Sequence, residues 1–200
     1  MADDLRAGRG TIRLTRGDIT LLEVDAVVFY ARPDLQLGSG YGTAISVRGG
    51  PAVQADLKKV ATPVATTEAV ITTGGNLKAR HVLHVVGPRF QEEGSEAKLR
   101  ASVVNVLALA DRHGLKRVAL PAMGAGFYGV PLDLCARVML RAIRAHLAGG
   151  SGIEEAVVCL LDGRETRAFQ AEMARIAGEA GSEAAPAAAD PRALAAGGRS

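Results

Sequence analysis

The chain has 200 residues, of which 48% are hydrophobic and 22% charged, which is typical of one globular domain. Its 24 Lys and Arg against 21 Asp and Glu give a net charge of only +3, without the clustered basic residues of a protein that binds duplex nucleic acid. Cys135 and Cys159 lack a paired Cys or His motif, which excludes a zinc module and a disulfide framework. No apolar run reaches about 18 residues, which excludes a membrane helix.

Short β-branched runs alternate along the chain with segments of helical periodicity. The first predicted strand alternates polar and apolar residues, whereas the later ones are continuous apolar runs typical of strands covered on both faces. The predicted strands cover residues 11–15, 26–29, 68–72, 82–86, 117–120 and 156–161. Helices are predicted at residues 43–47, 52–60, 97–113, 131–147 and 165–176. This order predicts a three-layer α/β/α sandwich on a mostly parallel sheet, with ligands at the carboxyl ends of the strands.

The ends of the chain differ from the segment between them. The core pattern starts at residue 11 and fades near residue 181, so we assign residues 1–10 to an N-terminal extension, 11–181 to the domain and 182–200 to a tail. The tail is rich in Ala, Pro and Gly and has no aromatic or β-branched residue, so it cannot bury enough apolar area to offset its ordering entropy. We expect it to be disordered. Pro186 and Pro191 oppose the alternative, an Ala-rich helix.

The most informative segment runs from Val118 to Pro131, where an apolar strand leads into a glycine-rich loop and then a helix. Such a loop exposes backbone N–H groups beside the positive end of a helix dipole, which is what a phosphate needs. A Walker motif has Lys and Ser or Thr after its last glycine, whereas this loop has Val130 and Pro131, so the Walker motif is excluded. The glycine pattern of dinucleotide-binding folds also fits this loop poorly. We predict a phosphate-binding loop. The alternative is a plain turn that needs glycines for positive φ.

Two further segments follow strands and could meet that loop. Residues 38–42 form a second glycine cluster after the strand at 26–29, and two such loops can close on one diphosphate from both sides. Asp18 follows the first strand and offers a carboxylate suited to accept from an exocyclic amine. Its alternative role is that of a turn or N-cap residue, which Asp often fills.

These segments together resemble the macro domain family, whose members bind ADP-ribose. The resemblance runs from about Thr11 to Gly178. It rests on blocks in the family's order: Gly17–Thr20, Asp25–Val28, Ala44–Ile45, Gly49–Pro51, Gly75–Leu77, His84–Pro88 and Gly124–Pro131. It implies a three-layer sandwich with a six-stranded mixed sheet, and neither a cofactor nor a metal.

The resemblance also implies which residues form the ADP-ribose-binding site. Asp18 would hold the adenine amino group and the Ile19 backbone a ring nitrogen, while Tyr41 and the loop at 124–128 would cradle the diphosphate. The ligand-binding residues predicted in this way are Asp18, Ile19, Arg32, Gly38, Gly40, Tyr41, Gly42, Gly124, Ala125, Gly126, Phe127, Tyr128 and Leu161.

Three positions depart from the family's pattern. Arg32 replaces the asparagine that addresses the distal ribose, Gly42 replaces the aspartate of the hydrolytic members, and Leu161 replaces an aromatic residue that stacks on adenine. Because a glycine cannot orient a water or abstract a proton, we predict a module that reads or carries ADP-ribose, a derivative or an ADP-ribosylated macromolecule, with weak or no hydrolysis. The alternative is a metal-free hydrolase of ADP-ribosyl esters or an O-acetyl-ADP-ribose deacetylase.

The remaining expectations concern location and single residues. We expect a cytoplasmic protein with no membrane or nucleic-acid partner. His84 is predicted to be a hydrogen-bonded core residue, and the two cysteines to be small apolar fillers. Arg137, Arg141 and Arg144 form a stripe on one helix that is predicted to be a solvated face.

Overall fold

Seven strands form one mixed sheet in the part of the chain that the computed structural model describes, residues 3–38, 40–126 and 128–183. Their order across the sheet is β1-β2-β7-β6-β3-β5-β4, in which β1 and β4 are antiparallel to their neighbours and the rest are parallel. The bounds are β1 Asp4–Ala7, β2 Gly10–Arg16, β3 Ala26–Ala31, β4 Ala69–Thr73, β5 His81–Val86, β6 Arg117–Pro121 and β7 Glu155–Leu160.

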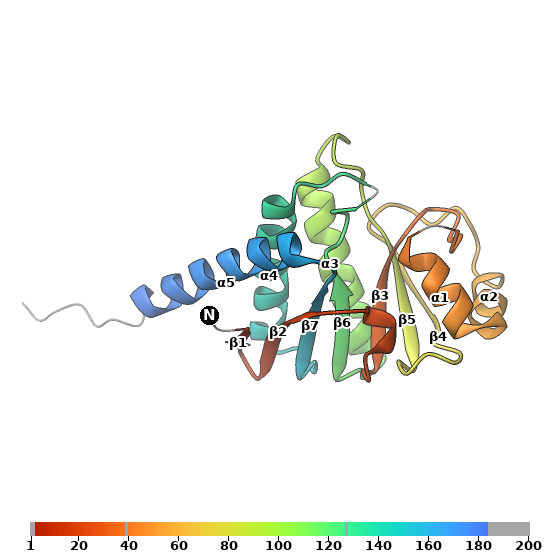
Figure 1. Ribbon diagram of the computed structural model, residues 1–200, viewed down its shortest axis with the longest axis horizontal. Coiled ribbons are helices and arrows are strands. Elements are labelled where there is room, and N and C mark those ends of the chain that lie inside the picture. Colours follow the sequence, from red (N-terminus) through yellow and green to blue (C-terminus); the bar gives the residue numbers. More distant parts are fainter. Residues whose placement is uncertain (1–2, 39, 127, 184–200) are drawn as a thin grey trace, which may run out of the picture.

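Helices cover both faces of this sheet (Figure 1). They are the 3-10 turn η1 Ile19–Leu21 and the helices α1 Tyr41–Gly49, α2 Pro51–Leu57, α3 Ser95–Arg112, α4 Leu132–Ala148 and α5 Gly163–Glu183. Alternate residues of a strand point to opposite faces. In β3, Val28 and Tyr30 therefore pack with α3, α4 and α5, whereas Val27 and Phe29 pack with η1, α1 and α2. Two apolar cores result, and the predicted three-layer α/β/α fold is confirmed.

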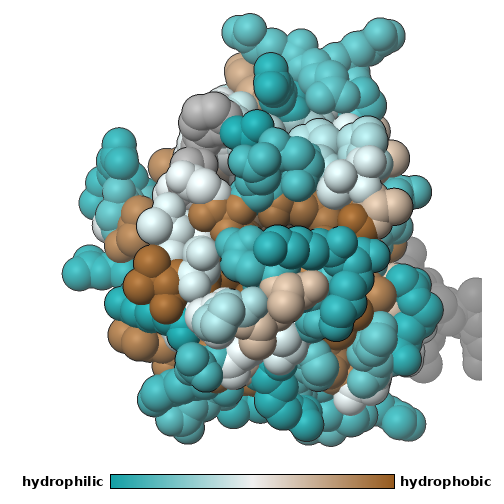
Figure 2. All heavy atoms as spheres, turned by 90° about the vertical axis from the view of Figure 1, so that its right-hand side faces the viewer, coloured by the Kyte–Doolittle hydropathy of each residue, from teal (hydrophilic) through white to brown (hydrophobic). Residues whose placement is uncertain are grey.

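The surface at the end that carries α1, α2 and β4 is mostly hydrophilic. Figure 2 shows this face with an apolar strip lying in a hollow across it. Single apolar side chains are also exposed, among them Val47 on α1 and Leu21 on η1. Scattered exposed apolar residues of this kind are normal on a soluble domain.

The six predicted strands are all present, with ends within one or two residues of those expected, and the sheet has a seventh. The added strand, β1, lies within residues 1–10 and pairs Asp4 with Arg13 of β2. Its sequence is short and mostly polar, so it lacks the apolar alternation that marks a half-buried strand. Helix α5 continues to Glu183, into the segment expected to be disordered, and residues 184–200 lie outside the described part of the chain.

The parallel strands determine where a ligand can bind. The carboxyl ends of β2, β7, β6 and β3 lie at the same edge of the sheet, because these four neighbours run in the same direction. Their loops begin at Gly17, Leu161, Ala122 and Arg32. Crevices outside the carboxyl ends of such strands are where open α/β sheets bind ligands.

Candidate ligand-binding cleft

A cavity of about 490 Å³ lies at this edge of the sheet. Residues that follow β2, β3, β6 and β7 line it, together with the start of α1 and of α5. The described lining residues are Gly17, Ile19, Phe29, Tyr30, Arg32, Gln36, Gly40, Tyr41, Pro121, Ala122, Gly124, Gly126, Tyr128, Cys159, Leu161 and Glu165.

The loop between β6 and α4 forms one wall, and its backbone needs glycine. Gly124 has φ +79°, and a Cβ there would lie 2.8 Å from Val130 Cγ2 and 3.3 Å from the Tyr30 hydroxyl. The Val130 N–H donates to the Gly124 carbonyl at 3.0 Å, which closes the loop on itself. A Cβ at Gly126 would meet nothing within 4 Å, so the backbone of Gly126 stays open toward the cleft. These features suit a loop that brings backbone N–H groups close to an anion.

The opposite wall is the start of α1. Gly40 is the N-cap residue of this helix and has φ +56°. Gly42 lies beneath the Phe29 ring, where a Cβ would come within 2.8 Å of Phe29 Cζ. A side chain at position 42 therefore has no room while Phe29 keeps its place.

Aromatic rings line the cleft with their hydroxyl groups turned toward the backbone. Tyr30 donates to the Pro88 carbonyl at 2.6 Å, Tyr41 donates to the Val28 carbonyl, and Tyr128 lies 3.5 Å from the Ala31 carbonyl. The Tyr30 and Tyr128 rings meet edge to face with centroids 5.0 Å apart. Burial raises the pKa of all three tyrosines, so each stays a neutral phenol near pH 7.

Two charged side chains line the cleft in its described part, at different ends. Arg32 follows β3 and pairs with Asp34 at 2.8 Å. Glu165 lies in the first turn of α5, after β7, and accepts a hydrogen bond from the Leu161 N–H at 2.6 Å. Because β6 lies between β7 and β3, the two charges are on opposite sides of the Gly124 loop.

Burial also governs the reactivity of these groups. It raises the pKa of Glu165, an effect to which the neighbouring Asp162 carboxylate adds. It likewise raises the pKa of the Cys159 thiol to about 11, so this thiol is protonated near neutral pH and is a poor nucleophile. Within the described residues, no group of three His, Cys, Asp or Glu is arranged to hold a metal ion.

The Macro domain family model matches residues 31–139 of the chain. The chain belongs to the macro domain family. Among similar sequences, a macro domain-containing protein of Caldanaerobacter subterraneus is 36% identical over 163 residues, which cover 79% of this macro domain chain and 93% of that protein. An uncharacterized protein of Saccharolobus solfataricus is 38% identical over 153 residues, covering 74% and 84% of the two chains.

Solved structures of macro domains share the fold. The Oceanobacillus iheyensis macrodomain with ADP superposes with a TM-score of 0.84 at 24% identity, covering 88% of this chain and 96% of that one. The Trypanosoma brucei macrodomain in complex with ADP-ribose superposes with a TM-score of 0.75 at 30% identity, covering 80% and 68%.

Most of the residues predicted for the site of this macro domain meet in the cleft. Those that line it are Ile19, Arg32, Gly40, Tyr41, Gly124, Gly126, Tyr128 and Leu161. Phe127 lies outside the described residues. The other predicted residues, Asp18, Gly38, Gly42 and Ala125, are not among the described lining residues.

Asp18 is the predicted residue whose surroundings differ most from expectation. It is the N-cap of η1 and accepts from the Thr20 N–H at 3.0 Å and the Thr20 hydroxyl at 2.6 Å. Its second oxygen pairs with Arg48 of α1. Burial alone would raise the pKa of Asp18, but the hydrogen bonds from Thr20 and Arg48 lower it. The N-cap alternative considered for Asp18 is therefore realised.

Sequence reasoning missed several lining residues. Phe29 is predicted to lie in the strand at 26–29, Cys159 to be an apolar filler and Glu165 to begin a helix, and Tyr30 is assigned no role; Phe29 and Tyr30 also belong to the buried core. Their shared signal is position: each lies at or just after the carboxyl end of a parallel strand.

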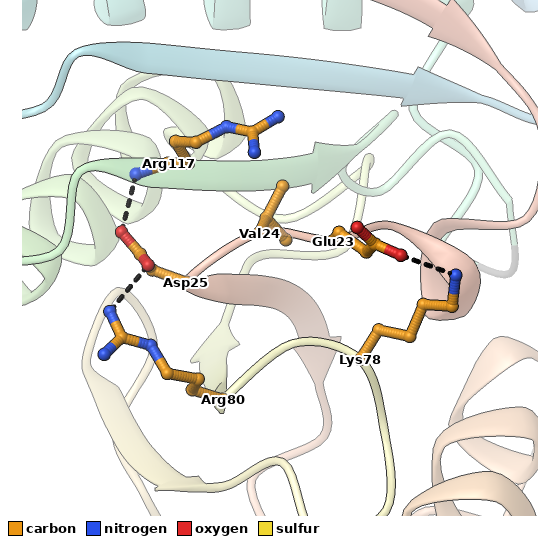
Figure 3. Close-up of a pocket in the computed structure, with 6 residues that line it drawn as sticks. All are labelled: Glu23, Val24, Asp25, Lys78, Arg80 and Arg117. Carbon is orange, nitrogen blue, oxygen red and sulfur yellow. Dashed lines mark hydrogen bonds and ion pairs between the residues drawn. The ribbon is translucent and has the colours of Figure 1, made fainter.

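A second pocket lies at the opposite edge of the sheet, where β3, β5 and β6 begin (Figure 3). Asp25 accepts from the backbone N–H groups of Lys116 and Arg117, at 2.6 and 2.9 Å, and from Arg80 at 2.6 Å. Lys78 pairs with Glu23 on the other side of the pocket. The Arg117 side chain, which also lines the pocket, pairs with Glu155 at 2.8 Å. Each charged side chain that lines this pocket therefore has a partner of opposite charge among the described residues.

No helix in the described residues is long and apolar enough to cross a membrane. The arginine stripe on α4 is largely paired: Arg137 contacts Glu96 of α3, and Arg141 contacts Glu172 and Glu179 of α5. The stripe therefore joins helices as well as facing solvent.

Proposed function

We propose that this macro domain binds ADP-ribose or an ADP-ribose derivative, free or attached to a macromolecule, as a reader or carrier, and hydrolyses ADP-ribosyl esters weakly. Membership of the macro domain family supports the ligand class, as does the T. brucei relative in complex with ADP-ribose. The cleft adds the local chemistry. Gly40 and Gly126 offer open backbone on two sides of its centre, where a diphosphate would lie, and neither is crowded by a neighbouring side chain.

The proposal that hydrolysis is weak rests on the packing of the Phe29 ring over Gly42. The hydrolytic members carry an aspartate at this position, and here a ring fills the space that its side chain would need. Arg32, at the position of the family's asparagine, is paired with Asp34. Asp34 in turn accepts from the Gln36 N–H at 3.2 Å, so its carboxylate is held within its own loop.

Other groups of the cleft do not replace the missing acid. Glu165 is the one carboxylate among the described lining residues, and it lies at the end of the cleft remote from Arg32. The tyrosine hydroxyls are held near backbone carbonyls, and burial keeps the Cys159 thiol protonated. General acid–base assistance supplies about 10² to 10⁴ in rate, so its loss should slow hydrolysis by that order.

The test compares binding with turnover. Calorimetry with ADP-ribose should give a measurable affinity. Incubation with O-acetyl-ADP-ribose and with a mono-ADP-ribosylated protein, beside a hydrolytic macro domain, should give turnover lower by roughly 10² to 10⁴. Turnover equal to that control would favour the alternative, an ADP-ribosyl ester hydrolase or deacetylase, and an Asp34→Ala variant that lost it would identify Asp34 as the base.

A further inference from the structure

A separate cavity of about 530 Å³, here called the flanking pocket, adjoins the cleft. The loop after β5 and the loop between β6 and α4 form it, and its lining residues are Arg89, Phe90, Gln91, Glu92, Tyr128 and Gly129. Tyr128 lines both the flanking pocket and the cleft. The volume lies within the range of roughly 300 to 1,000 Å³ that is typical of ligand sites.

The strand order places the flanking pocket beyond the Arg32 end of the cleft. The strands that carry the cleft follow the order β2-β7-β6-β3, and β5 is the next parallel strand, beside β3. Two hydrogen bonds fix the loop after β5 there. The Tyr30 hydroxyl donates to the Pro88 carbonyl at 2.6 Å, and the Phe90 N–H donates to the Tyr128 carbonyl at 3.1 Å. The flanking pocket thus continues the row of loops that forms the cleft.

One charged side chain of the flanking pocket is free to bind a ligand. The Arg89 guanidinium is exposed and makes no hydrogen bond or ion pair with another described residue. Glu92 is occupied, because it pairs with Lys98 and accepts from the Arg89 N–H at 3.4 Å. Glu93 is exposed on the same loop but does not line the pocket. The lining therefore carries one positive charge without a counter-charge.

The charge of Arg89 reaches the wall that separates the two cavities. Burial raises the pKa of the Tyr128 phenol, whereas the charges of Arg32 and Arg89 act in the opposite direction. Both guanidinium groups therefore lie near this ring, with Arg32 lining the cleft and Arg89 lining the flanking pocket. A ligand that passes Tyr128 on its way out of the cleft meets a positive potential.

These groups favour an acidic side chain as the occupant of the flanking pocket. A guanidinium can bind a carboxylate through two parallel N–H bonds, and it repels a cation. The rings of Phe90 and Tyr128 offer apolar surface to the aliphatic part of such a side chain. Gln91 adds an amide that can both donate to and accept from a peptide backbone.

We propose that the flanking pocket binds a Glu or Asp side chain beside the modified residue of an ADP-ribosylated protein, with Arg89 pairing with its carboxylate. In the proposed complex the distal ribose faces Arg32, so a protein joined to that ribose leaves the cleft past Tyr128. The domain then reads ADP-ribose together with an acidic peptide sequence. This inference rests on the proposed function, because it names the class of modified protein that the same site selects.

The test uses three peptides that differ only beside the modified residue. Each carries one ADP-ribose on a central serine, a linkage without the ester that hydrolysis would cleave, and the flanking residues are all Glu, all Gln or all Lys. Calorimetry gives the Kd of each peptide and of free ADP-ribose. Wild type should bind the Glu-flanked peptide roughly three- to tenfold more tightly than the Gln-flanked one, and the Lys-flanked peptide most weakly. This preference should shrink at about 1 M NaCl, because salt screens exposed charges.

Variants of Arg89 connect the preference to the pocket. Arg89→Met keeps an aliphatic stem and removes the charge, so the three peptides should bind with nearly equal Kd. Arg89→Glu should reverse the order and favour the Lys-flanked peptide. Since the Arg89 side chain is exposed, both variants should fold, and their melting temperatures check this.

Arg112→Met is the matched control. Arg112 is likewise exposed and unpaired in the described part of the chain, and it lies in the last turn of α3. Lys98, which pairs with Glu92 of the flanking pocket, is in the first turn, about 20 Å away along the helix. Arg112→Met removes the same charge from the molecule and should keep the wild-type order of the three peptides.

The outcomes separate this inference from the proposed function. If wild type binds neither free ADP-ribose nor any peptide, the proposed function fails. If wild type binds all four ligands and shows equal Kd for the Glu- and Gln-flanked peptides, the function stands and the role of the flanking pocket is overturned. A preference that persists in Arg89→Met, or that Arg112→Met removes as fully, would mean that charges elsewhere select the peptide, and it overturns the inference as well.

Discussion

A substitution at the single residue Gly126 tests whether the cleft binds the diphosphate of ADP-ribose. A side chain at this position meets no neighbour, and its backbone does not have the positive φ of Gly124, so Gly126→Glu should fold normally. The added carboxylate would face the diphosphate, and like charges at short range should weaken ADP-ribose binding roughly a hundredfold or more. Calorimetry measures the loss. Gly178→Glu on the exposed side of α5 is the matched control, and equal affinity in the two variants would remove the Gly124–Gly126 loop from the binding site.

A second prediction for a single residue concerns His84 and the dependence of folding stability on pH. The ring is fully buried, with Nε2 at 2.9 Å from the Thr72 hydroxyl. That hydroxyl donates to the Thr73 carbonyl at 3.1 Å, which favours the tautomer in which Nε2 donates to the hydroxyl. Nδ1 has no hydrogen-bond partner in the described structure. Burial lowers the pKa of His84 to about 4, below its unfolded value near 6.5.

Because the unfolded chain takes up this proton first, His84 should make the fold less stable as pH falls. The free energy of unfolding should be unaffected by His84 above about pH 6.5, decline by about 1.4 kcal/mol per pH unit down to about pH 4, and level off below. Urea unfolding at pH 7 and pH 5 should show a decline about 2 kcal/mol larger in wild type than in His84→Leu. The same decline in both proteins would contradict a buried neutral imidazole.

At the scale of elements, the contact between α4 and α5 includes a buried acid. Glu172 is only 4% exposed and pairs with Arg141 at 2.9 Å, while Arg175 lies 3.6 Å away. Arg141→Met should lower the free energy of unfolding by about 1 to 3 kcal/mol, since removing one partner leaves a buried charge incompletely paired. Arg137→Met is the control on the same helix: its pair with Glu96 is half-exposed and should contribute less than about 1 kcal/mol.

A double variant separates charge from packing in that contact. If Arg141 matters because it neutralises Glu172, then Arg141→Met combined with Glu172→Leu should recover most of the lost stability in urea unfolding. Losses that simply add would mean that the aliphatic stem of Arg141, not its charge, joins the helices.

At the scale of the whole molecule, the last buried anchors of the described C-terminal helix precede its end. Phe169, Met173 and Ile176 of α5 are buried in the core beside α4. Deleting residues 184–200 should therefore leave the melting temperature within about 1 °C and the ADP-ribose affinity unchanged. Thermal unfolding and calorimetry on the shortened chain check this, and a drop of several degrees would show that the deleted residues contribute to the fold.

Much of the architecture was readable from the sequence. The continuous apolar runs at β3, β5, β6 and β7 predict strands covered on both faces, and the periodicity of α3 and α4 predicts their amphipathic faces, because burial imposes these patterns locally. The glycines at 124 and 126 also mark a loop beside a helix start. Local pattern thus determined the layers and the edge of the sheet where the cleft lies.

Tertiary structure decided what each side chain in the cleft can do. From the sequence alone, Asp18 is an acid without a known partner, whereas the fold brings Arg48 of α1 beside it. Glu165 is predicted only to begin a helix, whereas the fold places it in the lining of the cavity. Phe29 reads as strand core, yet its ring also fills the space above Gly42. The strand β1 could not be predicted from hydrophobic periodicity, because its residues form a strand only through their pairing with β2. β1 pairs with the strand that follows it directly. For Asp18, Glu165 and Phe29, in contrast, the deciding surroundings come from other parts of the chain, and such contacts leave no periodic trace in the sequence.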